Sequence, residues 1–199
     1  MKWMIASDLH GSVYYCEKLL EAIKREKPGR ILLLGDILYH GPRNDLPKGY
    51  DPKAVTAALN PLKNQILCVR GNCDTEVDQM VLDFPILADY CVLDLGERAA
   101  IAAHGHHYSM ESLPPMKAGD LFLQGHTHVP GHWVKDGILC LNPGSVSIPK
   151  EQSWHGYLML DQKEAVWKDL DGIVKDQIGL ESYTCLLYTS PSPRDRSLS

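Results

Sequence analysis

Short runs of apolar residues recur along this chain, and in its first part they alternate with segments of helical periodicity. From residue 13 onward, apolar residues recur three and four positions apart among Glu and Lys, until Pro28 and Gly29 end the pattern. The segments expected here are strands at 3–6, 31–34 and 65–69 and helices at 13–27 and 52–60. This alternation predicts an α/β fold that begins with parallel βαβ units.

Later in the chain the pattern changes to β structure. A helix is expected at 75–82, followed by strands at 90–95, 99–103, 120–123, 132–135, 138–141, 157–161 and 165–170. These strands have the spacing of hairpins, and Asp136-Gly137 is a typical hairpin turn. Two packed sheets with helices outside would accommodate both halves. The segment 35–51, rich in Gly, Pro, Asn and Asp, is expected to be a long functional loop.

Composition and charge exclude several classes of protein. With 199 residues, 44% of them apolar and 23% charged, the chain has the composition of one globular domain, expected at 1–184. Its net charge of -5 offers no bulk attraction to nucleic acid or to an anionic membrane. Six scattered cysteines and the lack of a signal peptide or a long apolar stretch predict a cytoplasmic protein. Residues 185–199, with no periodic apolar face, are expected to be a disordered or non-native tail.

Polar residues that bind metals follow the ends of five predicted strands. They are Asp8, His10, Asp36, Asn72, His104, His126 and His128. The carboxyl ends of the strands in an open α/β sheet share one edge, where ligands bind, so these seven side chains are expected to converge. A single Gly-Asp or Asp-x-His is common in caps and turns, but five such signals in order point to a shared site.

The types of these residues indicate an open metal site. If the backbone stays extended, Asp8 and His10 point the same way, as do His126 and His128. Carboxylate, imidazole and amide donors without thiolate suit Mn²⁺, Fe²⁺, Zn²⁺ or Mg²⁺. One carboxylate that bridges two ions would account for seven ligands. Glycines next to Asp36, Asn72, His104 and His126 would let the backbone approach closely.

Together these motifs resemble the signature of the calcineurin-like metallophosphoesterases. They are Asp8-x-His10, Gly35-Asp36, Gly71-Asn72, His104-Gly105 and Gly125-His126-Thr127-His128. The likeness runs from about Lys2 to Asp171, and the segments 40–50, 69–80 and 142–150 resemble the bacterial YfcE-type phosphodiesterases within that superfamily. It implies a four-layer αββα sandwich of two mixed β-sheets flanked by helices, with two metal ions at the sheet edge.

The resemblance also implies a role for each residue. Asp8, His10 and His128 would hold one ion, Asn72, His104 and His126 the other, and Asp36 would bridge them. A hydroxide between the ions would attack the phosphoryl group in line, with Asp36, Asn72, Cys73 and His104 as the catalytic residues. Mn²⁺ is the activating ion by resemblance, although the ligands alone do not exclude Fe, Zn or Mg.

Cys73 departs from the common superfamily pattern, in which a His at this position is thought to protonate the leaving group. The YfcE-type sequences resemble this one in carrying Cys there. A thiol has an ordinary pKa of about 8.5 against about 6.5 for His, so esters with acidic leaving groups, such as aryl phosphodiesters, would be preferred. Alternatively Cys73 is only a packing residue, and His106 or His107 supplies the proton.

The function expected is hydrolysis of small phosphodiesters by a cytoplasmic, dinuclear-metal phosphoric diester hydrolase, without nucleic-acid or membrane partners. One alternative is a nuclease of the same superfamily, against which stands the lack of a basic stripe. A second is a non-catalytic metal-binding scaffold, since the retromer scaffold subunit resembles these enzymes in fold. Exposed sheet edges also favour a homo-oligomer.

Overall fold

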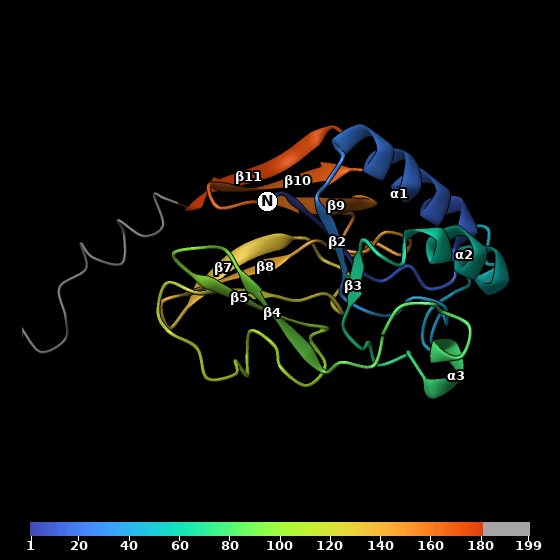
Figure 1. Ribbon diagram of the computed structural model, residues 1–199, viewed down its shortest axis with the longest axis horizontal. Helices are drawn as coiled ribbons and strands as arrows, with labels where there is room; N and C mark the ends of the chain where they lie inside the picture. The colour runs from blue at the N-terminus through green and yellow to red at the C-terminus, as the bar shows by residue number, and fades with distance from the viewer. Residues whose placement is uncertain (181–199) are drawn as a thin grey trace, which may run out of the picture.

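The computed structural model describes residues 1–180, which form two mixed β-sheets packed face to face (Figure 1). The first sheet has the order β11-β10-β9-β1-β2-β3 and the second β4-β5-β6-β8-β7. The first consists of β1 (Trp3–Ala6), β2 (Arg30–Leu33), β3 (Ile66–Cys68), β9 (Gly156–Leu160), β10 (Glu164–Asp169) and β11 (Val174–Gly179). The second consists of β4 (Tyr90–Asp94), β5 (Ala99–Ala103), β6 (Leu121–Leu123), β7 (Gly131–Lys135) and β8 (Ile138–Asn142). The predicted sandwich of two mixed sheets is confirmed.

Alternation of side chains along β1 explains its central place. Met4 and Ala6 face the helices α1 (Val13–Glu26) and α2 (Pro52–Leu59), whereas Trp3 and Ile5 face the second sheet. A strand buried on both faces must be apolar throughout, which is why it reads as an unbroken apolar run. The helices therefore cover one face of the first sheet, and the core between the sheets covers the other (Figure 1).

The outer face of the second sheet is covered differently. Phe122 and Cys140 point outward and pack against Met110, Leu113 and Met116 of the long connection between β5 and β6. Within residues 1–180 no helix contributes to this cluster. The resemblance implied helices on both outer faces. In the described residues α1 and α2 cover the first sheet, whereas a loop covers the second.

The pairing in the second half of the chain differs from the expected hairpins. β4 with β5 and β7 with β8 are antiparallel, but β6 pairs parallel with both β5 and β8. The turn between β7 and β8 has φ of 52° at Asp136 and 76° at Gly137, as a tight hairpin requires. Strands β9 to β11 return to the first sheet, where β9 lies antiparallel to β1.

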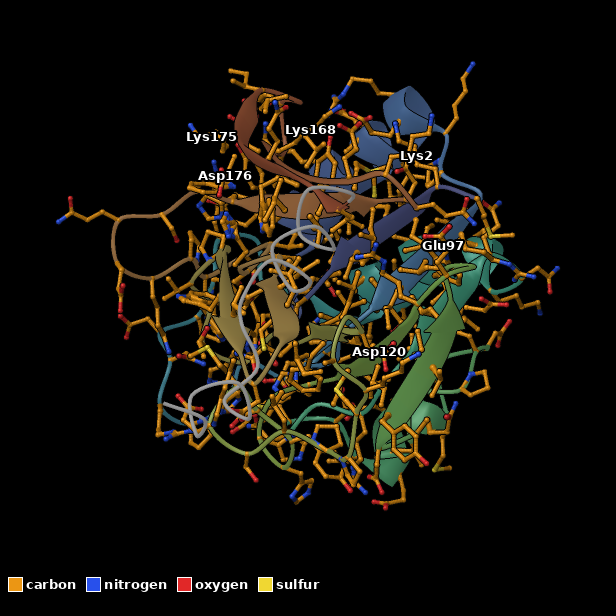
Figure 2. The ribbon with its side chains drawn as sticks, turned by 90° about the vertical axis from the view of Figure 1, so that its left-hand side faces the viewer. Lys2, Glu97, Asp120, Lys168, Lys175 and Asp176 are labelled. Atoms are coloured by element: carbon orange, nitrogen blue, oxygen red, sulfur yellow. The ribbon has the colours of Figure 1, made fainter. Side chains whose placement is uncertain are left out.

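Two further elements differ from the sequence-based expectation. The helix expected at 75–82 is one turn long, α3 (Glu76–Gln79), followed by a turn, while a short 3-10 helix (Asn60–Leu62) extends α2. The edge strand β11 was not expected, and three of its six residues, Lys175, Asp176 and Gln177, are charged or polar. Figure 2 shows Lys168, Lys175 and Asp176 on the hairpin that β10 and β11 form.

Residues 185–199, predicted to be a tail, lie outside the described residues. Within 1–180 no helix has the length and apolar character needed to cross a membrane.

Candidate metal centre

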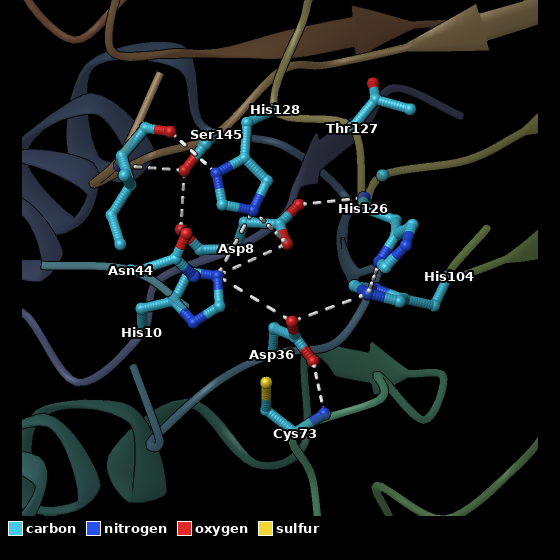
Figure 3. Close-up of polar contacts among 12 residues, drawn as sticks. Asp8, His10, Asp36, Asn44, Cys73, His104, His126, Thr127, His128 and Ser145 are labelled. Atoms are coloured by element: carbon cyan, nitrogen blue, oxygen red, sulfur yellow. Dashed lines mark hydrogen bonds and ion pairs between the residues drawn. The ribbon is translucent and has the colours of Figure 1, made fainter. Parts of the chain in front are cut away.

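The seven candidate ligands lie in loops at the carboxyl ends of five strands. Asp8 and His10 follow β1, Asp36 follows β2, Asn72 follows β3, His104 follows β5, and His126 and His128 follow β6. Because β1, β2 and β3 are parallel in one sheet and β5 and β6 in the other, both sheets deliver these loops to one end of the sandwich. Figure 3 shows the side chains of six of them, all but Asn72, gathered around one point.

Three side chains form a first cluster. Asp8 Oδ1 lies 3.2 Å from His128 Nε2 and 3.5 Å from His10 Nε2, and the two imidazole nitrogens are 3.3 Å apart. All three residues are buried. One carboxylate oxygen and two ring nitrogens at these distances could contact a single ion.

A second cluster lies around His104. Its Nε2 is 3.0 Å from Asn72 Oδ1 and 3.1 Å from His126 Nδ1. Asp36 joins the two clusters, because its Oδ2 lies 3.5 Å from His104 Nε2 and 3.7 Å from His10 Nε2. Its other oxygen, Oδ1, accepts a hydrogen bond of 2.8 Å from the backbone N–H of Cys73, which holds the carboxylate in this position (Figure 3).

In three of the histidines, the hydrogen bond that Nδ1 makes determines the tautomer of the ring and so the state of Nε2, which faces the centre. Nδ1 of His10 donates a hydrogen bond to the carbonyl of Tyr39 at 2.7 Å. Nδ1 of His104 donates to the carbonyl of Leu34 at 2.6 Å, and Nδ1 of His128 to that of Ile148 at 2.7 Å. In a neutral imidazole that donates from Nδ1, Nε2 carries a lone pair. When the three rings are neutral, these contacts aim three lone pairs at the centre, the arrangement found around protein-bound metals.

The charges at the centre favour a cation. Burial opposes ionisation of Asp8, but the neighbouring imidazoles of His10 and His128 hold the pKa of its carboxyl well below the usual value. Burial likewise opposes protonation of His104, yet the carboxylates of Asp36 and Asp8 raise its pKa to about 9. Asp8 Oδ1 is buried and has no hydrogen-bond partner. An unpaired buried carboxylate oxygen among imidazole nitrogens fits a divalent cation.

The backbone is not extended at Asp8 and His10 or at His126 and His128, where the sequence analysis considered an extended conformation. Positive φ angles occur at Asp8 (59°), His10 (47°), Asp36 (55°), His126 (66°) and His128 (62°). Non-glycine residues seldom adopt this left-handed conformation, and where they do it is commonly at functional sites. The side chains converge as predicted, but through tight left-handed turns and not through alternation along a strand.

Two glycines allow these turns to pack against each other. A Cβ on Gly71 would overlap the backbone nitrogen and Oδ1 of Asp36, and one on Gly125 would overlap Ser7 Oγ. The close approach expected of these glycines is present in the structure. Alanine at either position would displace a candidate ligand loop.

Asp74 supports the site, and the sequence analysis assigned it no role. Its carboxylate accepts backbone hydrogen bonds from Asp36 at 2.8 Å, Ile37 at 2.9 Å and Gly71 at 2.7 Å. It thereby ties the loop after β2 to the loop after β3. Its place in the Gly71–Asp74 turn is the only sequence signal for this role.

The turn at 142–147 supports the loops after β1 and β6. Asn142 Nδ2 donates to the carbonyl of Gly125 at 3.0 Å. The hydroxyls of Ser145 and Ser147 donate to the carbonyl of Asp8 at 2.8 and 3.0 Å. These side chains shape the backbone and do not enter either cluster.

A cleft of about 430 Å³ opens over the centre, and its lining includes Asp36, Asn72, His126 and His128. Arg43 and Lys150 also line it and add positive charge. Anions entering the cleft would meet these two cations next to the candidate ligands.

The residues considered as proton donors lie close to the centre. Cys73 is buried at the cleft wall, and its Sγ accepts a hydrogen bond of 3.3 Å from Asn72 Nδ2. Burial, together with the charge of Asp36, raises the pKa of its thiol to about 12. The ring of His106 lies 5.3 Å from that of His104, and His107 lies beyond it, 4.1 Å from His106.

Residues 1–165 match the Calcineurin-like phosphoesterase superfamily domain. The chain belongs to this superfamily. It is 45% identical over 161 residues to the protein named Phosphodiesterase YfcE of Escherichia coli strain K12, which covers 81% of this chain and 88% of the relative. The solved structure of the E. coli phosphoesterase Yfce matches with a TM-score of 0.87 and 41% identity, over 90% of this chain and 100% of that one. The predicted superfamily and enzyme class are confirmed.

Vps29 of Chaetomium thermophilum is similar in fold alone. Its structure matches with a TM-score of 0.59 at 15% identity, over 90% of this chain and 97% of that chain. This likeness carries no information about catalysis.

Proposed function

We propose that this protein hydrolyses small phosphodiesters with the help of two divalent cations. One observation carries the proposal: Asp36 Oδ2 lies between two clusters of metal-ligand atoms, 3.7 Å from His10 Nε2 and 3.5 Å from His104 Nε2. The phosphodiesterase name of the 45% identical relative supports the choice of diesters. Mn²⁺ is the proposed ion, and Fe, Zn and Mg are the alternatives.

We assign Asp8, His10 and His128 to one cation, Asn72, His104 and His126 to the other, and Asp36 to both. When bound, the cations would supply Lewis acidity, which acidifies water and neutralises charge on the phosphoryl oxygens. Bonds from Nδ1 to backbone carbonyls orient the rings of His10, His104 and His128, so the ligands need little rearrangement on binding.

Arg43 and Lys150, which line the cleft, would bind the anionic phosphate of the substrate. A phosphodiester carries a single negative charge, which two exposed cations and the centre suffice to hold. In the described cleft these residues do not form the basic stripe that a long nucleic acid needs. We therefore favour small diesters over a nuclease substrate.

We also propose a cytoplasmic location and a homo-oligomeric state. Five cysteines within the described residues are free thiols, which is in keeping with a reducing cytoplasm. The edge strand β4 exposes Tyr90 and Val92, a surface suited to contact between copies in a homo-oligomer.

Removal of metal is expected to abolish turnover. Chelator-treated protein should hydrolyse bis(4-nitrophenyl) phosphate at under about 1% of the rate measured after Mn²⁺ is restored, because the cations supply the Lewis acidity. Mn²⁺ at about 100 times its Kd should also raise the free energy of unfolding by about 2.7 kcal/mol for each cation bound, measured by calorimetry. Undiminished turnover by protein shown to be free of metal would contradict the proposal. Tight metal binding without turnover on any phosphoester would favour the scaffold alternative.

Replacement of Cys73 tests its role in leaving-group protonation. We expect 4-nitrophenyl methyl phosphate to be hydrolysed at least about 100-fold faster than phenyl methyl phosphate, since a thiol is a weak general acid. Cys73→His should reduce this ratio to about tenfold or less by supplying an imidazole. Cys73→Ser, of similar size, should leave it high. If all three proteins give the same ratio, Cys73 is a packing residue.

A further inference from the structure

A second hollow, of about 460 Å³, lies beside the cleft and shares Cys73 with it. We call it the apolar pocket. Its walls come from the loop after β2, from α2 and from the segment around α3. The lining residues that matter here are Leu38, Tyr39, Tyr50, Thr56, Val77 and Val81. Because Cys73 is buried between the two hollows, its side chain forms a common wall.

The loop after β2 connects the apolar pocket to the metal centre. Tyr39 lines the pocket with a side chain that is 42% exposed, while its carbonyl accepts the 2.7 Å hydrogen bond from His10. Two residues further on, the backbone at Gly41 passes so close to Cys73 that a Cβ there would lie 3.2 Å from its Sγ. Gly41 and Arg43 then line the cleft. One loop thus forms both hollows side by side.

Apart from Lys53 and Asp78, the side chains that line the pocket are uncharged, which suits an uncharged group. Asp78, which lines it, already accepts hydrogen bonds from the backbone N–H and hydroxyl of Thr75 at 2.8 and 2.9 Å. At the rim, Val77 is 69% and Val81 48% exposed, and the neighbouring Met80 is 83% exposed. Apolar side chains gathered in the open around a concave surface are typical of a binding site for an apolar group.

We propose that the apolar pocket binds one aliphatic or aromatic ester arm of a phosphodiester whose phosphate occupies the adjacent cleft. This inference rests on the proposed function. The occupant is a substrate arm because the pocket and the cleft share Cys73 as a wall, so a phosphodiester bound in the cleft can extend one arm past Cys73 into the pocket. The substrate class is therefore a phosphodiester with one apolar arm, held at its phosphate by Arg43 and Lys150.

Binding of two dialkyl phosphates to the Mn²⁺-loaded protein tests this inference. Dimethyl phosphate and benzyl methyl phosphate carry the same single charge, and their poor alkoxide leaving groups make hydrolysis slow on the time scale of a titration. Isothermal titration calorimetry should show at least about tenfold tighter binding of the benzyl compound, through burial of its ring. The same binding of both compounds would overturn the inference.

A matched pair of variants locates the preference. Val77→Asn places a neutral polar group at the pocket rim and should reduce the preference for the benzyl compound to about twofold or less, with binding of dimethyl phosphate unchanged. Val134→Asn is the control, because Val134 is 60% exposed on β7, away from the pocket lining. An equal effect of both variants would overturn the inference.

Two further outcomes separate the inference from the proposed function and from a rival occupant. Suppose that bis(4-nitrophenyl) phosphate is not hydrolysed, but the wild type prefers the benzyl compound and Val77→Asn does not. The proposed function is then wrong, and the inference about the apolar pocket is supported. If turnover is present without the benzyl preference, only the pocket fails. If Val77→Asn instead dissociates an oligomer in sedimentation and the wild type shows no preference, a second copy of the chain occupies this surface.

Discussion

Asp36→Asn is expected to lower kcat/KM for bis(4-nitrophenyl) phosphate by at least about 1000-fold, equivalent to about 4 kcal/mol of transition-state stabilisation. The side chain keeps its size, but the amide replaces one oxygen by a donor and removes the charge that both clusters share. Oδ2 lies 3.7 Å from His10 Nε2 and 3.5 Å from His104 Nε2, so the change affects both proposed cation sites. Steady-state kinetics at saturating Mn²⁺ would measure the loss.

A control for this variant is available in the same loop. Asp45 is exposed, and Asp45→Asn removes the same charge without touching the centre. We expect it to retain nearly full activity. Metal content of the two variants should be compared after dialysis, with loss of bound Mn²⁺ expected only for Asp36→Asn. Activity of Asp36→Asn within about tenfold of the wild type would refute the role assigned to Asp36.

Asp74→Asn is expected to weaken Mn²⁺ binding by about 10- to 100-fold, although Asp74 belongs to neither cluster. Its carboxylate accepts three backbone N–H groups, those of Asp36, Ile37 and Gly71. The amide of Asn has only one acceptor oxygen. Its NH₂ group would face at least one of these backbone N–H groups, so at least one hydrogen bond is lost. We also expect a loss of about 2–4 kcal/mol in the free energy of unfolding, since buried charge-assisted bonds are broken.

The measurement must distinguish displacement of Asp36 from general instability. Mn²⁺ titration by calorimetry at a temperature well below the Tm of the variant isolates the effect on the site. Asp83→Asn is the control, because Asp83 is half exposed and pairs only at the surface with Lys63, at 3.0 Å. It should cost less than about 1 kcal/mol and leave Mn²⁺ affinity unchanged. Asp74→Asn with wild-type affinity would show that Asp36 is positioned without Asp74.

Local patterns predicted most elements because they report burial directly. In β1, unbroken apolar sequence corresponds to burial on both faces, by the helices through Met4 and by the second sheet through Ile5. In α1, the periodic residues predicted the buried face that includes Leu19. The edge strand β11 escaped prediction, because it is held by pairing with β10 and none of its residues is buried.

For the site, the order of strand ends and polar residues was sufficient to predict which side chains converge. Parallel strands of one sheet present their carboxyl ends at one edge, which accounts for Asp8 after β1 and Asp36 after β2. His104 follows β5 of the other sheet and lies 3.5 Å from Asp36, because the two sheets pack with these strand ends at the same end of the sandwich. Their assignment to individual cations remains a prediction. The backbone conformation of Asp8 and His10 was expected incorrectly, since a left-handed turn leaves no periodic trace in the sequence.

The sequence by itself thus indicated the two-sheet class through periodicity and the seven candidate ligands through motif order, and the resemblance of these motifs to a known signature indicated the superfamily. Only the tertiary structure decided the return of β9 to pair with β1, the support of Asp36 by Asp74 across 38 residues, and the apolar pocket beside Cys73. The physical reason is the range of the interactions. Along a helix or strand, buried side chains recur with the period of that element, so the pattern is visible in the local sequence. Hydrogen bonds between loops and pockets between elements depend on segments that lie far apart in the chain.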